Sequence, residues 1–278
     1  MDYLLITISA LLFSLQFLFN NQFQERNGVS VEGAFQFSFY TSVFGFMLLI
    51  FTNGLRFEFS VFSFVVAVVY ALINFLLNYC SIKAFRHASL SVYSIFAMIG
   101  GLILPFVYGV LCGDEFKLIR LLCCLLILFS ILLTLEKGKS VKAFRYYLAV
   151  FFLNGMVGVV SAFHQAQTAL CVDSGSFLMM TRVVMMLVSL MYLSVKKSVR
   201  IDLPSLGYCA GHSVVNTVGN LLILIALLTL APSVQYPIVT GGTIIFSVVI
   251  DFVRKVKVTK KQIIAAFVSL LASVFMAF

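Results

Sequence analysis

The sequence predicts an all-α integral membrane protein with ten transmembrane helices, arranged as two inverted five-helix repeats. Three observations support this prediction: an apolar composition, ten long apolar runs, and an internal repeat. The chain has 278 residues, of which 62% are hydrophobic and 10% charged, and its mean hydropathy is +1.10. A soluble domain carries about 25% charged residues, so the solvent for most of this surface must be lipid.

Ten apolar runs have the length of membrane spans. Lipid offers no partners to backbone polar groups, so only helices and closed barrels cross it, and the continuous runs exclude the alternating pattern of a barrel. With about 20 apolar residues per span, we expect helices at about 2–23, 31–53, 60–82, 89–112, 117–136, 144–171, 174–196, 205–230, 233–253 and 259–277. The first run lacks a basic leader and a cleavage site, so we interpret it as a span and not as a signal peptide.

The chain contains one of its stretches twice. A shift of about 142 residues aligns the sequence with itself without a gap, and the matched pairs include Asn74–Asn216, Asn78–Asn220 and Gly100–Gly242. The polar interruption between the fifth and sixth spans divides the chain into repeats at 1–139 and 140–278. Because five is odd, the second repeat must cross the membrane in the opposite orientation, which is how alternating-access transporters are built.

Basic residues are distributed unevenly between the connections, which predicts the orientation in the membrane. The even-numbered connections carry only Arg56, Lys117 and Arg120. The odd-numbered connections carry Arg26, Lys83, Arg86, Lys137, Lys139, Lys142, Arg145, Lys196, Lys197, Arg200, Arg254, Lys255, Lys257, Lys260 and Lys261. We therefore expect the odd-numbered connections in the cytoplasm and both termini outside, in the cytoplasmic or inner membrane of a bacterium.

Charge and cysteine usage exclude several other classes of protein. The net charge of +9 fits basic loops that face a cytoplasm and anionic lipid, and no phosphate-binding loop indicates nucleic acid. The six cysteines lack metal-ligand spacing, so we expect packing residues and not a zinc site or a set of disulfides. All ten acids lie at or near predicted helix ends. No carboxylate is therefore expected at mid-span to bind a permanent cation.

Polar side chains inside the spans are the candidate substrate-binding residues, because an unpartnered amide is costly in hydrocarbon. Asn74 and Asn78 share one helix face, and Asn216 and Asn220 share another. Arg182 is a charge well inside its span, which by itself indicates function. The alternative for the amides is hydrogen bonding between packed helices, and for Arg182 it is a lipid headgroup or an end acid. The full candidate set is Gln16, Asn20, Asn74, Asn78, Tyr93, Asn154, His164, Gln165, Arg182, His212, Asn216, Asn220, Gln235 and Tyr236.

Ten hydrophobic helices in two halves with short basic connections resemble the drug/metabolite transporter superfamily, in particular its EamA-like branch. The segment 113–115 (Gly-Asp-Glu) is similar to the family's Gly-Glu punctuation before the fifth span, and 258–259 (Val-Thr) resembles the start of the tenth. At 254–255, Arg-Lys stands where an acid is usual. The resemblance implies a central cavity lined by the first, third, fourth, sixth, eighth and ninth spans, with the fifth and tenth at the periphery.

We expect a secondary transporter that moves a small polar metabolite, whether neutral, zwitterionic or weakly anionic, by alternating access. Two alternatives stay open: a flippase for lipids or lipid-linked headgroups, and an exporter of drugs or organic cations that uses an aromatic cage. No nucleophile, acid–base pair or cofactor motif indicates an enzyme. We expect no cofactor, metal or nucleic acid. The expected partners are a small-molecule substrate and membrane lipid, and the expected state is a monomer or homodimer.

Overall fold

The computed structural model describes residues 2–28, 30–85, 90–112, 141–226, 232–256 and 258–275, with 118–119, 121–123, 125–126 and 129. These residues form helices and no strand. The helices are α1 (Asp2–Asn27), α2 (Val31–Thr52), α3 (Val61–Phe85), α4 (Leu90–Leu111), α6 (Val141–Ala166), α7 (Ser174–Lys196), α8 (Leu203–Ala226), α9 (Pro232–Val253) and α10 (Lys260–Phe275). The span expected at 117–136 falls largely outside the described residues.

The described helices are those of a multi-pass membrane protein. Five of them contain stretches long and apolar enough to cross a bilayer, and these are Tyr3–Asn27, Val31–Thr52, Val61–Ala84, Phe144–Ala166 and Ser174–Lys196. Two shorter apolar helical stretches are Phe96–Leu111 and Ile238–Val253. Large apolar side chains such as Phe51, Met191 and Phe252 are more than two-thirds exposed. Lipid is the solvent that such an outer surface requires.

The ends of α1 and α6 differ most clearly from the sequence-based expectation. The polar cluster expected to end the first helix near residue 23 instead continues α1 to Asn27, and the helix stops at Gly28, whose φ of +72° is left-handed. The helix expected to reach residue 171 stops at Ala166. The backbone N–H groups of Leu170 and Cys171 bond back to the Gln167 carbonyl in a tight turn (2.9 Å each). That turn redirects the chain into α7.

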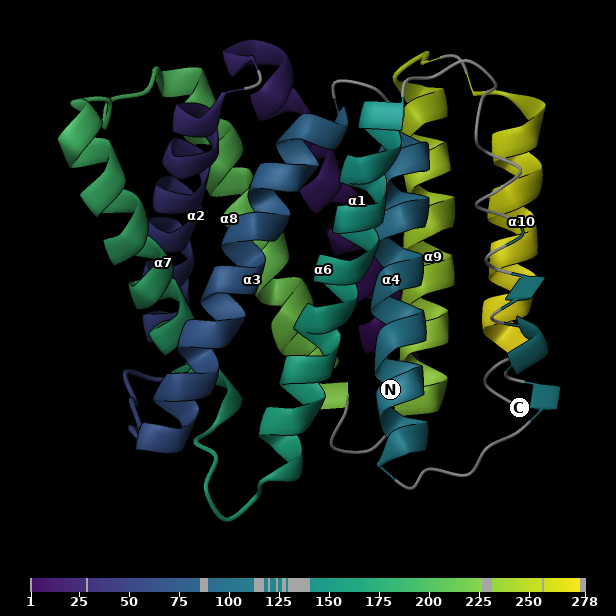
Figure 1. Cartoon of the computed structure of the whole chain (residues 1–278), viewed down its shortest axis with the longest axis horizontal. Helices are drawn as coiled ribbons and strands as arrows, with labels where there is room; N and C mark the ends of the chain where they lie inside the picture. The colour runs from purple at the N-terminus through teal and green to yellow at the C-terminus, as the bar shows by residue number, and fades with distance from the viewer. Residues whose placement is uncertain are drawn as a thin grey trace.

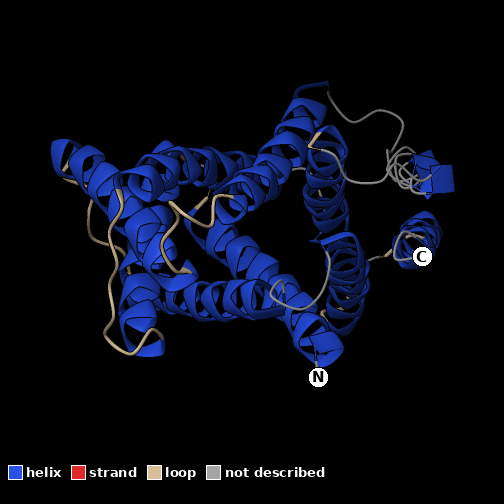
Figure 2. Cartoon of the chain, turned by 90° about the horizontal axis from the view of Figure 1, so that it is seen from below, coloured by secondary structure: helices blue, strands red, loops and turns tan. Residues whose placement is uncertain are grey.

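Helices that are far apart in the sequence pack side by side. Helix α1 packs on α8 and α9, α4 on α6 and α9, α2 on α7 and α8, and α3 on α6 and α7. Figure 1 shows α1 and α6 running in opposite directions, as do α3 and α8. Among the described helices, α10 packs mainly on α9, and the view from below places it at one edge of the bundle (Figure 2).

The bundle has two chemically different ends. At the basic end, Arg26 and Asp202 form an ion pair at 2.5 Å, and Arg254 and Glu25 form another at 3.3 Å. These pairs join the α1–α2, α7–α8 and α9–α10 connections. At the opposite end, the Ser60 hydroxyl donates to the Leu170 carbonyl at 2.8 Å, which joins the α2–α3 and α6–α7 connections. The α1–α2, α7–α8 and α9–α10 connections therefore lie at one end, and the α2–α3 and α6–α7 connections lie at the other.

Apolar clusters fill the bundle around its middle. One cluster includes Ile99 of α4, Val150 of α6 and Ile244 of α9, and it also takes in residues of α1, α3 and α10. Another includes Leu49 of α2, Tyr70 of α3 and Phe177 of α7. A third, near the basic end, contains Phe23, Ala34, Phe37, Ile82 and Cys209, each at most 1% exposed. These clusters fix the helices that line the candidate site.

Candidate functional site

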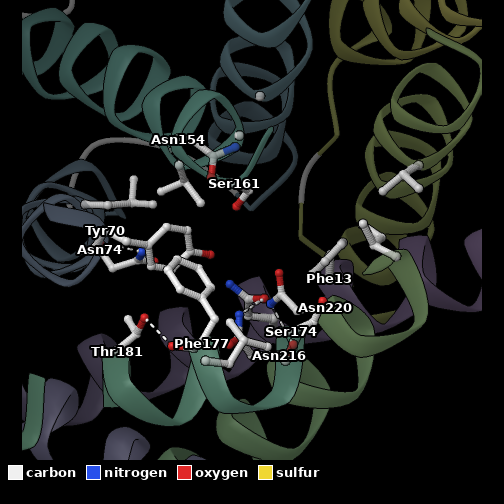
Figure 3. A pocket seen from close by; sticks show the side chains of 18 of the residues that line it. Phe13, Tyr70, Asn74, Asn154, Ser161, Ser174, Phe177, Thr181, Asn216 and Asn220 are labelled. Atoms are coloured by element: carbon white, nitrogen blue, oxygen red, sulfur yellow. Dashed lines mark hydrogen bonds between the residues drawn. The ribbon is translucent and has the colours of Figure 1, made fainter. Parts of the chain in front are cut away.

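A cavity of ≈ 160 Å³ lies between the helices in the middle of the bundle (Figure 3). Seven helices contribute to its wall: α1, α3, α4, α6, α7, α8 and α9. An apolar cavity of about 150 Å³ accommodates a benzene-sized molecule. The space is therefore that of a small metabolite.

Most of the candidate residues from the sequence meet at this cavity, although they come from both halves of the chain. The candidates that line it are Gln16, Asn74, Asn78, Asn154, His164, Gln165, Arg182, His212, Asn216, Asn220 and Tyr236. The matched pairs Asn74–Asn216 and Asn78–Asn220 thus lie on the wall of one space. Whether they bind a substrate stays a prediction.

Three candidates do not line the cavity. Asn20 is buried on α1 one turn beyond Gln16, toward the basic end. The hydroxyl of Tyr93 lies 2.6 Å from the Ser81 hydroxyl, and its ring packs edge-on against Phe17, a wall residue. The amide of Gln235 donates to the Ile223 carbonyl at 2.7 Å and is fully buried between α8 and α9. Tyr93 and Gln235 thus contact neighbouring helices outside the cavity wall.

The wall also includes residues that sequence reasoning did not select. Helix α7 contributes to it, contrary to what the family resemblance implies, and one of its residues is Phe177. Tyr70 lies one turn before Asn74 on α3, so the same helix face predicts it. Phe177 has no comparable signal, because one phenylalanine among 30 cannot be distinguished from those that face lipid.

The wall amides are held by hydrogen bonds from their NH₂ groups. Asn74 donates to the Tyr70 carbonyl at 2.9 Å, and Asn220 donates to the Asn216 carbonyl at 2.7 Å, each one turn back on its own helix. Asn154 donates to the carbonyl of Ala97 on α4 at 2.6 Å. Amides fixed in this way present defined polar groups to whatever occupies the cavity (Figure 3).

Arg182 stands at the end of a chain of hydrogen bonds that crosses three helices. Its Nη2 donates to Oδ1 of Asn216 on α8. Nδ2 of Asn216 in turn donates to Oε1 of Gln16 on α1, at 2.8 Å. The guanidinium also approaches the backbone of α2, since a Cβ built on Gly45 would lie 3.0 Å from Arg182 Nε. Glycine at this position leaves room for the arginine.

The two histidines on the wall have different surroundings. His164 of α6 stacks on Phe177 with ring centroids 4.0 Å apart, and its Nε2 lies 2.9 Å from the Ser63 hydroxyl. His212 of α8 is 4% exposed and meets the ring of Phe37 edge-on, with centroids 4.7 Å apart. His164 is thus tied to α3, whereas His212 contacts the apolar cluster near the basic end.

The described wall contains no aspartate or glutamate, so Arg182 gives it a net positive charge. Among the described residues, no group of three or more His, Cys, Asp or Glu side chains is placed to hold a metal ion.

The wall reaches Gln165 and Ser174 near the opposite end. Toward the basic end, the cluster around Phe23 and Phe37 fills the space between helices.

No family model matches this chain, and no curated protein matches it. Solved structures do match its fold. One of them, described only as "Crystal structure of protein", superposes with a TM-score of 0.71 over 99% of this chain and 96% of its own, at 11% sequence identity. At this identity the likeness shows the fold alone.

Proposed function

We propose that the protein is a secondary transporter that moves a small polar metabolite across the membrane by alternating access. The observation that carries this proposal is a metabolite-sized cavity in the middle of the bundle, lined by amides from both halves of the chain. Transporters bind their cargo near the bilayer midplane, where two structural repeats meet. A buried amide that faced only lipid would lack partners, so a polar cavity accounts for these side chains.

The helix contacts support an inverted repeat of two five-helix units, 1–139 and 140–278. Helix α1 packs on α8 while α3 packs on α6; α4 packs on α6 while α1 packs on α9; and α2 packs on α8 while α3 packs on α7. The proposed repeat matches α1 with α6, α2 with α7, α3 with α8 and α4 with α9. When each helix is exchanged for its match, the first contact of each pair becomes the second. The opposite directions of α1 and α6 are those that such a repeat requires (Figure 1).

The glycines matched by the repeat also support this arrangement. A Cβ on Gly100 of α4 would collide with the backbone of Phe151 on α6. A Cβ on the matched Gly242 of α9 would lie 2.9 Å from the Cβ of Ala10 on α1. Both glycines thus allow close helix approach at interfaces that the proposed symmetry exchanges.

The charge of the two ends favours one orientation. The basic end carries Arg26, Arg200 and Arg254, and the opposite end carries Arg56. By the positive-inside tendency, the basic end faces the cytoplasm of a bacterial cell and both termini lie outside. Ten spans with this arrangement resemble the EamA-like transporters, and we propose membership of that superfamily.

The cavity is less suited to an organic-cation exporter, because the one full charge on its described wall, that of Arg182, has the same sign as such a cargo. A space of ≈ 160 Å³ holds a small molecule and not a whole lipid, so a flippase could pass only a headgroup through it. Both arguments favour a small substrate that is neutral or carries negative charge.

The proposal is tested by binding and flux. Purified protein is screened for thermal stabilisation against amino acids, organic acids, nucleobases, vitamins and amines, and each hit is assayed for uptake into proteoliposomes. We expect at least one hit to be transported, and we expect Asn74→Ala and Asn216→Ala to lower its uptake. Gln24→Ala is the control, because it removes an amide from α1 outside the cavity wall. Hits that bind without any flux would contradict the transporter.

A further inference from the structure

The side chain that sets the chemistry of the cavity is Arg182. It lies about a third of the way along α7, is half-buried, and is the only Arg or Lys on the described wall. A charged side chain inside a membrane protein is costly and is retained when it has a partner or a function. Its partners therefore decide which of the two applies.

Among the described residues, the partners of Arg182 are neutral. Arg182 donates to the amide oxygen of Asn216. A Cβ built on Gly45 would lie 3.0 Å from Arg182 Nε and from the Ser213 hydroxyl and 3.3 Å from the Thr217 hydroxyl, so the other polar groups at this spot are neutral. The ion pairs between described residues at the basic end involve Arg26 and Arg254, and Arg182 forms none with a described acid. Described residues accept a hydrogen bond from the guanidinium of Arg182, but none of them neutralises its charge.

The network around Arg182 holds it in place. Gln16 accepts from Nδ2 of Asn216 at 2.8 Å, which turns the oxygen of that amide toward the arginine. A guanidinium has five N–H donors in a planar fork, and one of them is committed to Asn216. The remaining donors match the two oxygens of a carboxylate, which guanidinium binds bidentately.

We propose that Arg182 is the anion-binding subsite of the cavity and that the substrate is a small monocarboxylate. This inference rests on the proposed transport function and names the class of its cargo. Arg182 carries one positive charge that no acid on the described wall neutralises, so a substrate with one negative charge would balance it. Phe13 and Phe177 offer apolar surface to the rest of the molecule, and Asn74 and Asn220 offer amides to its neutral polar groups (Figure 3). Tyr236 adds a further aromatic ring to the wall.

The same geometry excludes other cargo classes. A permanent cation would meet Arg182 without any carboxylate on the described wall to compensate for it. A dicarboxylate would leave one of its charges unpaired in a desolvated space, which is costly. The amide analogue of a bound acid keeps its size and shape but loses the charge, so it is the most direct probe of this subsite.

The test measures binding of matched acid–amide pairs by thermal shift and calorimetry: lactate with lactamide, 4-hydroxybenzoate with 4-hydroxybenzamide, and nicotinate with nicotinamide. Choline and benzylamine are the cationic probes. We expect at least one acid to bind at least about tenfold more tightly than its amide, because the neutral amide cannot pair with the charge of the guanidinium. We expect Arg182→Gln to remove that preference. Arg200→Gln is the control, because it deletes the same charge from an exposed position outside the cavity.

Every other result overturns the subsite: no acid binds at millimolar concentration, the amides or amines bind as well as the acids, or Arg182→Gln keeps the preference. Stability of the unliganded protein guards against misfolding, since Arg182→Gln is expected to leave its apparent Tm unchanged or raise it by removing an uncompensated charge. Flux separates the two proposals. An acid that binds through Arg182 without being transported contradicts the transporter alone. Wild-type protein that transports only neutral compounds, at a rate that Arg182→Gln leaves unchanged, contradicts the subsite alone.

Discussion

The hydroxyl of Ser63 on α3 lies 2.9 Å from Nε2 of His164 on α6 and accepts a hydrogen bond from the backbone N–H of Val172 at 3.0 Å. One buried hydroxyl thus joins α3 to a cavity residue and to the α6–α7 connection. Val172 and His164 are both less than 9% exposed, so water cannot readily replace the serine.

Ser63→Ala is expected to lower the free energy of unfolding by about 1–3 kcal/mol, because it leaves a buried N–H and a ring nitrogen without their partner. Thermal unfolding in detergent measures the change. Ser194→Ala is the matched control, since Ser194 is exposed on α7 and should show almost no effect. Equal effects from the two variants would contradict this role for Ser63.

Gly100→Ala is expected to separate α4 from α6, because its new Cβ would overlap the backbone of Phe151. Backbone atoms cannot turn aside as a flexible side chain can, so we expect a loss of about 1–3 kcal/mol or more. Gly207→Ala is the control, since nothing lies within 4 Å of a Cβ at that position. Size-exclusion profiles and apparent Tm compare the two variants, and a stable Gly100→Ala protein would contradict the close approach.

Asn216→Asp is expected to place a carboxylate beside Arg182, where Asn216 already accepts a hydrogen bond. The new ion pair neutralises the cavity charge, so acid binding should fall while the apparent Tm stays the same or rises. In an Arg182→Gln background the same change buries an unpaired carboxylate and should lower the apparent Tm. A double-mutant cycle measures this coupling. Additive effects would show that the two side chains do not interact.

Gly45→Ala is expected to weaken acid binding more than it affects stability. Its Cβ would lie 3.0 Å from Arg182 Nε and from the Ser213 hydroxyl, so the arginine must shift by a few tenths of an ångström. Small displacements of a bidentate pair reduce affinity, and we expect roughly a two- to tenfold loss. Calorimetry with the acid that binds wild-type protein measures it. Unchanged affinity would place the bound acid away from the guanidinium.

The orientation of the bundle is tested with single cysteines in a cysteine-free background. Arg56→Cys at the opposite end is expected to react with an impermeant thiol reagent in intact cells. Lys197→Cys at the basic end is expected to react only after the membrane is permeabilised. Both positions are exposed. Labelling in the reverse pattern would invert the proposed topology.

Much of the fold follows from local chemistry. Long apolar runs predicted membrane helices, because lipid leaves a helix as the way to satisfy backbone groups within one segment. Turn residues predicted the breaks between the runs. The first helix nevertheless extends to Asn27, because Gln24, Glu25 and Arg26 are good helix formers. The order of the apolar runs does not specify which helices touch, so the packing of α1 on α8 could not be predicted in this way.

The sequence by itself determined the chemistry of the repeated asparagine pairs and of Arg182, since each is a polar group that hydrocarbon penalises. Only the tertiary structure decided which of these side chains share a space. It brought Asn74 and Asn216 to one cavity. It placed Gln235 against the Ile223 carbonyl and Tyr93 against the Ser81 hydroxyl, outside the cavity wall. The physical reason is that a helical period fixes the face of a side chain, whereas the neighbour of that face depends on contacts between distant segments.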